Sequence, residues 1–215
     1  DGITSQGLDV IRIDLASTDM LYFASGKLNL PGAMFTASHN PAAYNGIKLC
    51  FSGARPIGRE SGLLTIENLM NEGVPMVMRN VGVEKHEPML QAYVDHLLKL
   101  IDVSEIRPLK IVIDAGNGMA GHTAPAVFER LNASVVELYF ELDGNFPNHE
   151  ANPIEPANLA DLQRAVKKNK ADIGLAFDGD ADRCFLVDEK GDLVNPYTLT
   201  ALIASRELAK NPEST

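Results

Sequence analysis

The chain has 215 residues, 45% of them hydrophobic, which exceeds the size of an average single domain and suffices for two modest ones. Its formal net charge of −10 argues against a general surface for nucleic acid or anionic lipid. No apolar run approaches the length of a membrane-spanning helix, so we predict no nucleic-acid and no membrane partner. An anionic ligand would need a locally basic pocket in this acidic protein.

In the first half of the chain, apolar runs alternate with amphipathic stretches. Strands are predicted at 8–15, 32–37 and 46–51, and helices at 17–26, 61–73 and 87–102. Ser17 or Thr18 is expected to cap the first helix and Gly26 to end it. The last of these helices has the clearest pattern, because its large apolar residues keep to one face.

The segment 103–108 has the composition of a domain boundary. After it, strands are predicted at 110–115, 135–140, 172–177 and 184–189, and helices at 124–131, 158–170 and 197–209, with an irregular Asn- and Pro-rich loop at 143–156. Strands that alternate with helices predict α/β layers around mixed or parallel sheets.

The first motif along the chain is "TASHNP" (36–41), followed by "YNGIK" (44–48). Ser38 comes directly after a predicted strand, so its hydroxyl is expected on a constrained, exposed turn. A nucleophilic serine needs a base or electrostatic help, and His39 and Lys48 are the nearby candidates. The pattern differs from the G-x-S-x-G elbow of hydrolases, and a Ser-His pair in a turn is by itself more often structural.

The second motif, "GNGMAG" (116–121), has the G-x-G-x-x-G spacing of a dinucleotide-binding turn, and Glu141 follows where a ribose-binding acid would lie. Asp114 precedes the turn, however, and would place negative charge beside a pyrophosphate. The alternative is a tight strand-to-helix turn whose glycines allow close packing. A dinucleotide-binding oxidoreductase therefore stays an alternative function.

The third motif is "DGDADRCFLVD" (178–188), in which Asp178, Asp180 and Asp182 follow an apolar strand. Carboxylates crowded on one loop raise one another's pKa unless a cation compensates, and their oxygens suit a hard cation such as Mg²⁺. An EF-hand loop would place Glu189 at its last position but requires glycine where Arg183 stands. A solvated acidic turn and a non-catalytic cation-binding module are further alternatives.

A cation site, a hydroxyl and basic residues together suit phosphoryl transfer, where positioning and charge neutralisation supply most of the catalysis. In order and spacing, "TASHNPAAYNGIK", "GNGMAG", "DGNFPNHEANP" and "DGDADR" resemble the α-D-phosphohexomutase family. "NPAAYNGIKL" with "GARPIG" (53–58) is most similar to its phosphomannomutase/phosphoglucomutase branch. Tyr44 stands where the phosphoglucosamine mutase branch usually has an acidic residue, and that branch is the alternative within the family.

The resemblance implies roles for individual residues. Ser38 matches the serine that carries a phosphate in the resting enzyme, and one of its oxygens completes the metal site. Asp178, Asp180 and Asp182 match the ligands of one Mg²⁺ ion. Arg183 matches the arginine near the phosphoserine.

His39 and Lys48 match residues that flank the transferred group, and Lys48 is the better acid/base candidate of the two. The identity of the general base stays open. Asn40 is expected to hold the shape of the serine loop.

The resemblance also implies two consecutive three-layer α/β/α domains with mixed sheets and active-site loops at strand ends. We expect a phosphoserine-loop domain at 1–103, lacking its N-terminal part, and a metal-binding domain at 104–215. The implied activity interconverts hexose 6-phosphate and hexose 1-phosphate, with mannose and possibly glucose as the sugar, through a hexose 1,6-bisphosphate.

The expected partners are a sugar phosphate and the remaining domains of a longer enzyme. The absent domains would recognise the sugar and its second phosphate, so we expect this chain alone to be inactive. The cysteines, Cys50 and Cys184, lie in strand-like runs and read as buried free thiols in a reducing compartment, so a cytoplasmic location is expected.

Overall fold

The computed structural model describes residues 1–74, 80–104 and 106–212. Its contacts divide the chain into two compact units: unit 1 comprises 1–36 and 45–102, and unit 2 comprises 37–44 and the chain from residue 103 onward. The serine loop at 37–44 therefore packs with the second unit, although unit 1 flanks it in the sequence. The predicted boundary segment 103–108 includes residue 105, which lies outside the described residues.

Unit 1 contains short strands in two separate sheets. Its elements are α1 (Gly2–Ser5), β1 (Val10–Arg12), α2 (Thr18–Leu28), β2 (Gly32–Phe35), β3 (Ile47–Phe51), β4 (Arg55–Pro56), α3 (Leu64–Glu72), β5 (Glu84–His86) and α4 (Leu90–Leu100). Strands β2, β3 and β4 form an antiparallel sheet, and β1 pairs with β5 in parallel. Sequence patterns did not predict α1, β4 or β5, because elements of two to four residues carry too little periodicity.

The core of unit 1 lies between α2 and α4. Met20 and Ala24 of α2 pack against Tyr93 of α4 and against Met89 directly before it. The Ser17 hydroxyl caps α2 by accepting a hydrogen bond from the Met20 amide at 3.3 Å, as predicted.

The prediction that Gly26 ends α2 is wrong. The helix continues to Leu28, and Asn29 ends it with a left-handed φ of 53°. Asparagine tolerates that conformation nearly as well as glycine, so Gly26 is not needed as a terminator.

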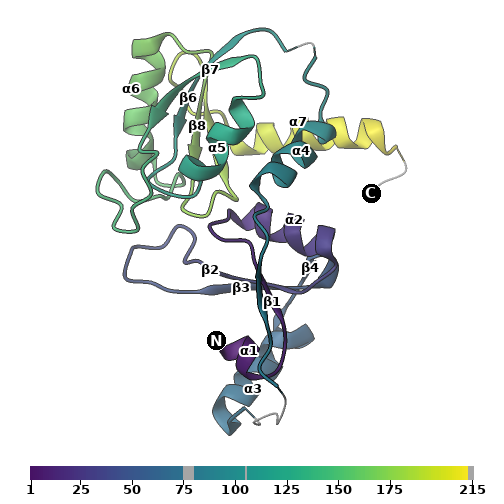
Figure 1. Cartoon of the computed structure of the whole chain (residues 1–215). Helices are drawn as coiled ribbons and strands as arrows, with labels where there is room; N and C mark the ends of the chain where they lie inside the picture. The colour runs from purple at the N-terminus through teal and green to yellow at the C-terminus, as the bar shows by residue number, and fades with distance from the viewer. Residues whose placement is uncertain (75–79, 105, 213–215) are drawn as a thin grey trace. The chain divides into compact units, whose positions relative to one another are not determined.

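Unit 2 is built on one four-stranded sheet (Figure 1). Its elements are β6 (Leu109–Asp114), α5 (Ala120–Phe128), β7 (Ala133–Leu138), α6 (Ala160–Asn169), β8 (Ile173–Phe177), β9 (Cys184–Val187) and α7 (Pro196–Lys210). The strand order is β7-β6-β8-β9; the first three strands are parallel, and β9 runs antiparallel to β8. The sheet is therefore mixed, as predicted.

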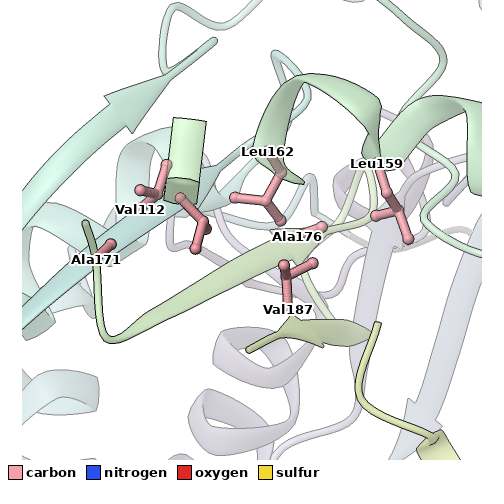
Figure 2. Close-up of a cluster of buried hydrophobic side chains, with 7 residues drawn as sticks. Val112, Leu159, Leu162, Ala171, Ala176 and Val187 are labelled. Carbon is pink, nitrogen blue, oxygen red and sulfur yellow. The ribbon is translucent and has the colours of Figure 1, made fainter. Parts of the chain in front are cut away.

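Helices cover both faces of this sheet, because the side chains of a strand alternate between faces. Val112 of β6 packs with Leu162 and Val166 of α6 in one core (Figure 2). Its neighbours Ile111 and Ile113 pack with Ala124 of α5 in the other. This three-layer arrangement confirms the predicted α/β fold class.

The predicted bounds of α5 and β7 in unit 2 are displaced. Helix α5 begins at Ala120 rather than 124, because the glycine turn leads directly into it. Strand β7 occupies Ala133–Leu138 rather than 135–140, where its whole length pairs with β6.

Cys50 is buried as predicted, whereas Cys184 is only partly buried; both are free thiols. Among the described residues, no helix has the length and apolarity required to span a bilayer.

Candidate active site

The three aspartates lie on one hairpin loop of unit 2. Residues 178–183 connect β8 to β9, and the last paired residues before the loop are Phe177 and Cys184. One carboxylate oxygen from each of Asp178, Asp180 and Asp182 lies within 4.8 Å of the others, and the first two residues are buried. Strands flank this loop on both sides, which is incompatible with the helix–loop–helix of an EF-hand.

Asp178 organises the loop. Its Oδ1 accepts hydrogen bonds from the amides of Asp182 and Arg183, each at 3.1 Å. Its Oδ2 accepts from Arg183 Nε at 2.9 Å. Burial raises the pKa of Asp178, and the charges of Asp180 and Asp182 raise it further against the opposing effect of Arg183 and its backbone amide. A bound cation would favour the ionised form of this buried carboxyl.

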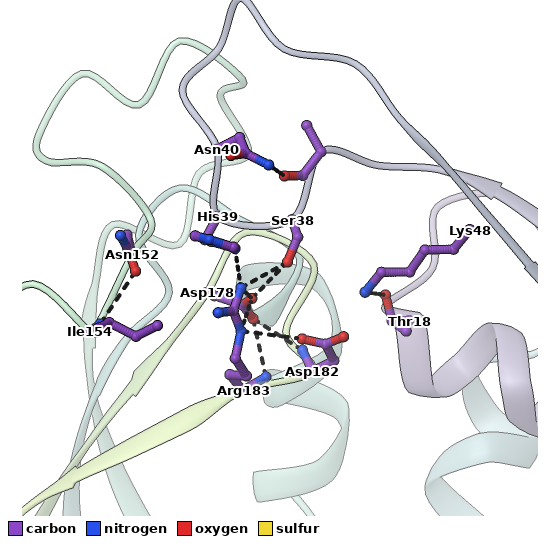
Figure 3. Close-up of polar contacts among 11 residues, drawn as sticks. Thr18, Ser38, His39, Asn40, Lys48, Asn152, Ile154, Asp178, Asp182 and Arg183 are labelled. Atoms are coloured by element: carbon purple, nitrogen blue, oxygen red, sulfur yellow. Dashed lines mark hydrogen bonds and ion pairs between the residues drawn. The ribbon is translucent and has the colours of Figure 1, made fainter. Parts of the chain in front are cut away.

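The serine loop approaches the same hairpin within unit 2 (Figure 3). The Ser38 hydroxyl donates to Asp178 Oδ2 at 3.0 Å. Arg183 Nη2 donates to Ser38 Oγ at 2.9 Å and also contacts Nδ1 of His39. Ser38 and His39 are thereby brought into contact with Asp178 and Arg183, which lie about 140 positions later in the sequence.

The shape of the serine loop has local causes. Ser38 has a left-handed φ of 54°. The Asn40 side chain donates to the Ala37 carbonyl at 2.8 Å, and its amide donates to the same oxygen at 3.0 Å, so Asn40 closes the turn.

Gly179 lets the two loops approach, although it was not among the site residues predicted from the sequence. An added Cβ at Gly179 would lie 2.3 Å from the Ser38 carbonyl oxygen. The sequence shows a glycine between Asp178 and Asp180, but only the folded structure shows that its missing side chain makes room for the Ser38 carbonyl.

Lys48 lies on β3 of unit 1, where its Nζ donates to Thr18 Oγ1 at 3.1 Å (Figure 3). Both residues of this hydrogen bond belong to unit 1. Its role as an acid or base stays a prediction.

The glycine turn at 116–121 is occupied by internal contacts. The amides of residues 116 to 119 donate to Asp114 Oδ1 and to the carbonyl oxygens of Tyr139, Ala115 and Gly179, respectively. An added Cβ at Gly118 would lie 2.7 Å from the Gly179 oxygen, and one at Gly121 would lie 2.1 Å from the Phe140 oxygen. These four amides have no hydrogen left for a pyrophosphate, so the turn supports packing and not a dinucleotide.

The donor set of the hairpin fits a hard divalent cation. All three candidate ligands are carboxylates, two of them buried, and the buried Asp178 has a raised pKa that a cation would offset. The adjacent Arg183 supplies positive charge beside the Ser38 hydroxyl. The donor set therefore suits a metal ion beside the Ser38 hydroxyl.

Known proteins match both units. Residues 1–75 match the description "Phosphoglucomutase/phosphomannomutase, alpha/beta/alpha domain I", and residues 91–191 match domain II of the same family. Phosphomannomutases of Vibrio cholerae and Escherichia coli K12 are 41% and 42% identical to this chain over 98% of its length. The chain spans about half the length of these relatives, 47% and 48%.

Solved structures give the same result. A phosphoglucomutase/phosphomannomutase family protein from Burkholderia thailandensis has a TM-score of 0.84 and 34% identity, covering 98% of this chain and 47% of its own. The Paramecium phosphoglucomutase parafusin has a TM-score of 0.68 at 20% identity, covering 88% of this chain and 42% of its own, which shows a shared fold. The chain belongs to the phosphoglucomutase/phosphomannomutase family and carries its domains I and II.

Proposed function

We propose that this chain supplies the phosphoserine and metal site of a phosphohexomutase, an isomerase that moves a phosphoryl group between two positions of a hexose. One observation carries the proposal: the Ser38 hydroxyl lies 3.0 Å from Asp178 Oδ2 and 2.9 Å from Arg183 Nη2, within a single unit. A serine between a carboxylate cluster and a guanidinium is suited to carry a phosphate that a cation neutralises.

In this proposal, Asp178, Asp180 and Asp182 hold one Mg²⁺, together with an oxygen of phosphorylated Ser38. The ion would neutralise charge on the phosphoryl group and orient it for in-line transfer. Arg183 donates to Ser38 Oγ and would stabilise this oxygen as it becomes the leaving group.

The transfer is balanced in atoms and charge. The bond between phosphorus and Ser38 Oγ breaks as a bond forms between phosphorus and a hydroxyl oxygen of the hexose monophosphate, giving a hexose 1,6-bisphosphate. The proton lost by the sugar hydroxyl balances the proton gained by Ser38. Transfer of the other phosphate back to Ser38 reverses these changes.

We propose Lys48 as the acid/base group and His39 as a residue that flanks the phosphoryl group. The contact of His39 with Arg183 supports the second assignment.

The names of the relatives support mannose phosphates as substrates, with glucose phosphates as a second possibility. Tyr44 supports this choice over phosphoglucosamine. Because the relatives are about twice as long, we propose that sugar recognition belongs to the part that this chain does not match. The complete cycle would then need that part as a partner, and this chain alone would be inactive.

We propose functional domains at 1–103 and 104–215. Residues 37–44 would contribute Ser38 to the unit that contains the hairpin loop 178–183, which we call the metal loop. A cytoplasmic location is also proposed, and the two free thiols support it.

Mass spectrometry of Ser38 tests the proposal. A longer protein that includes the remaining domains is incubated with Mg²⁺ and glucose 1,6-bisphosphate and then with mannose 6-phosphate, beside a Ser38→Ala control. We expect a phosphate on Ser38 that the sugar monophosphate removes. A phosphate on another residue, or one that survives the sugar phosphate in a protein with its remaining domains, would contradict the proposal. NADH binding detected by fluorescence would favour the oxidoreductase instead.

A further inference from the structure

A buried ion pair lies behind the metal loop in unit 2, and none of the roles above uses it. Asp114, at the end of β6, has a side chain that is 1% exposed, and its Oδ2 lies 3.0 Å from Nε2 of His149. His149 comes from the irregular loop that follows β7, and its side chain is 16% exposed. The pair therefore connects the central strand to a loop that has no regular structure of its own.

The hydrogen-bond partners of His149 indicate that both nitrogens of its imidazole ring are protonated. Its Nδ1 lies 2.9 Å from the Glu150 carbonyl oxygen, which can only accept a hydrogen bond. Its Nε2 faces the Asp114 carboxyl, whose other oxygen accepts from the Gly116 amide at 2.9 Å. With both ring nitrogens facing oxygen acceptors, the imidazole is best satisfied as the cation.

Tyr139 lies between the His149 ring and two further charged groups, Asp161 and Arg164. The Tyr139 ring packs edge-on against His149 with centroids 5.3 Å apart, and its hydroxyl donates to Asp161 Oδ2 at 2.5 Å. Arg164 in turn pairs with Asp161. The Asp114 hydrogen bond is the largest influence on His149 and raises its pKa.

The loop that contains His149 packs against the metal loop. Ala151 is buried, and an added Cβ at Gly116 or Gly179 would lie 3.2 or 3.8 Å from its Cβ. The Met119 amide donates to the Gly179 carbonyl at 2.9 Å, and Gly179 lies so close to the Ser38 carbonyl oxygen that an added Cβ would be 2.3 Å from it. A continuous series of contacts thus joins the ion pair to the serine.

We propose that Asp114 and His149 are positioning residues: as a buried, protonated ion pair they hold the loop 148–152 against Gly179 and thereby fix Ser38 relative to the aspartates. This inference rests on the proposed function for its catalytic meaning and on the contacts above for its geometry. It gives the "GNGMAG" and "NHEANP" segments a shared role, which is to support the metal loop from behind.

The test compares wild type with His149→Gln, which keeps a hydrogen-bond donor toward Asp114 but cannot carry the charge. Tyr139→Phe is the matched control, because it keeps the ring against His149 and loses only the bond to Asp161. Two quantities are measured from pH 5.5 to 9: the hydrogen-exchange rate of the Met119 amide without metal, and the affinity for Mg²⁺ alone.

Loss of groups that orient a metal site typically weakens metal binding about 10- to 100-fold. At low pH we therefore expect His149→Gln to raise the Mg²⁺ dissociation constant about tenfold and to speed the exchange of the Met119 amide. The ratios of variant to wild type for the exchange rate and for the Mg²⁺ dissociation constant, taken at the same pH, should fall toward one as His149 deprotonates. The control should stay near one. Ratios for His149→Gln that are pH-independent, whether one or larger, would overturn the proposal, because a merely space-filling role does not titrate.

A measurement on the wild type serves if His149→Gln does not fold. Nitrogen NMR should show both ring nitrogens of His149 protonated at pH 7; a neutral ring there would overturn the ion pair. If the wild type binds no Mg²⁺, the metal assignment of the proposed function fails, whereas Met119 exchange still decides this inference.

Discussion

Replacement of Gly179 by alanine tests whether the approach of the two loops sets the position of Ser38. The new Cβ would lie 2.3 Å from the Ser38 carbonyl oxygen, and non-bonded carbon and oxygen atoms need a separation about 1 Å larger. Gly179 does not have a left-handed φ, so the backbone itself accepts alanine and the effect is steric.

Because the Ser38 hydroxyl lies 3.0 Å from Asp178 Oδ2, a shift of about 1 Å moves it out of hydrogen-bond range. A misplacement of about 1 Å costs about 100-fold in a positioned reaction, and forced overpacking costs about 1–3 kcal/mol of stability. In a protein that includes the remaining domains, we therefore expect Gly179→Ala to slow phosphorylation of Ser38 by glucose 1,6-bisphosphate about 100-fold. The same substitution should lower the free energy of unfolding by about 1–3 kcal/mol.

Quenched-flow mass spectrometry measures the rate, and urea denaturation measures the stability. Gly144→Ala is the matched control, because an added Cβ there meets no atom within 4 Å in the same unit. If Gly179→Ala matches this control in both rate and stability, the close approach of the loops does not position Ser38.

Three further predictions concern the metal site, the ion pair and helix α2. Asp180→Ala should abolish Mg²⁺-dependent phosphoryl transfer without loss of unfolding free energy, because it removes repulsion among carboxylates; full activity would disprove the metal assignment. The pKa of His149 is raised in the folded state, so its stabilisation is complete below pH 6.5 and lost as the pH rises through the folded pKa. Denaturation of His149→Gln should show a larger loss of stability at pH 6 than at pH 9, and a loss equal at both would refute the ion pair. Gly26→Ala should raise the unfolding free energy by up to about 1 kcal/mol, because Gly26 is exposed within α2 and an added Cβ meets nothing within 4 Å; a loss of stability would contradict this view of the helix.

The sequence predicted the elements of unit 2 well, because its strands and helices are long enough to show a period. In β6 the short apolar run Ile111–Ile113 is buried without a break, as in a strand covered on both faces. In α6 the buried residues Leu162 and Val166 are four positions apart, which matches a helix. Strands β4 and β5 of unit 1 could not be predicted, since each has only two or three residues; β5 (Glu84–His86) is exposed throughout and is defined by its pairing with β1. Helix α2 ends at Asn29 and not at the predicted Gly26, because asparagine can also adopt the left-handed φ that ends a helix.

The motifs of the candidate site could be recognised in the sequence, but the residues that support them could not. The aspartates are visible as a motif because three carboxylates at alternate positions have no role in packing. Ser38 is visible because it follows a predicted strand, in the segment "TASHNP". Gly179, Asp114 and His149 act through contacts between segments that are far apart in the sequence. A local pattern does not contain such contacts, so their importance emerges only from the folded unit.

The central claim is that one divalent cation is held jointly by the aspartate loop and a phosphate on Ser38. Phosphorus NMR of the phosphorylated protein tests this directly, with Mn²⁺ in place of Mg²⁺. Direct coordination predicts severe broadening of the phosphoserine signal that disappears in Asp180→Asn. A phosphoserine signal that stays sharp while Mn²⁺ binds the protein would contradict the claim.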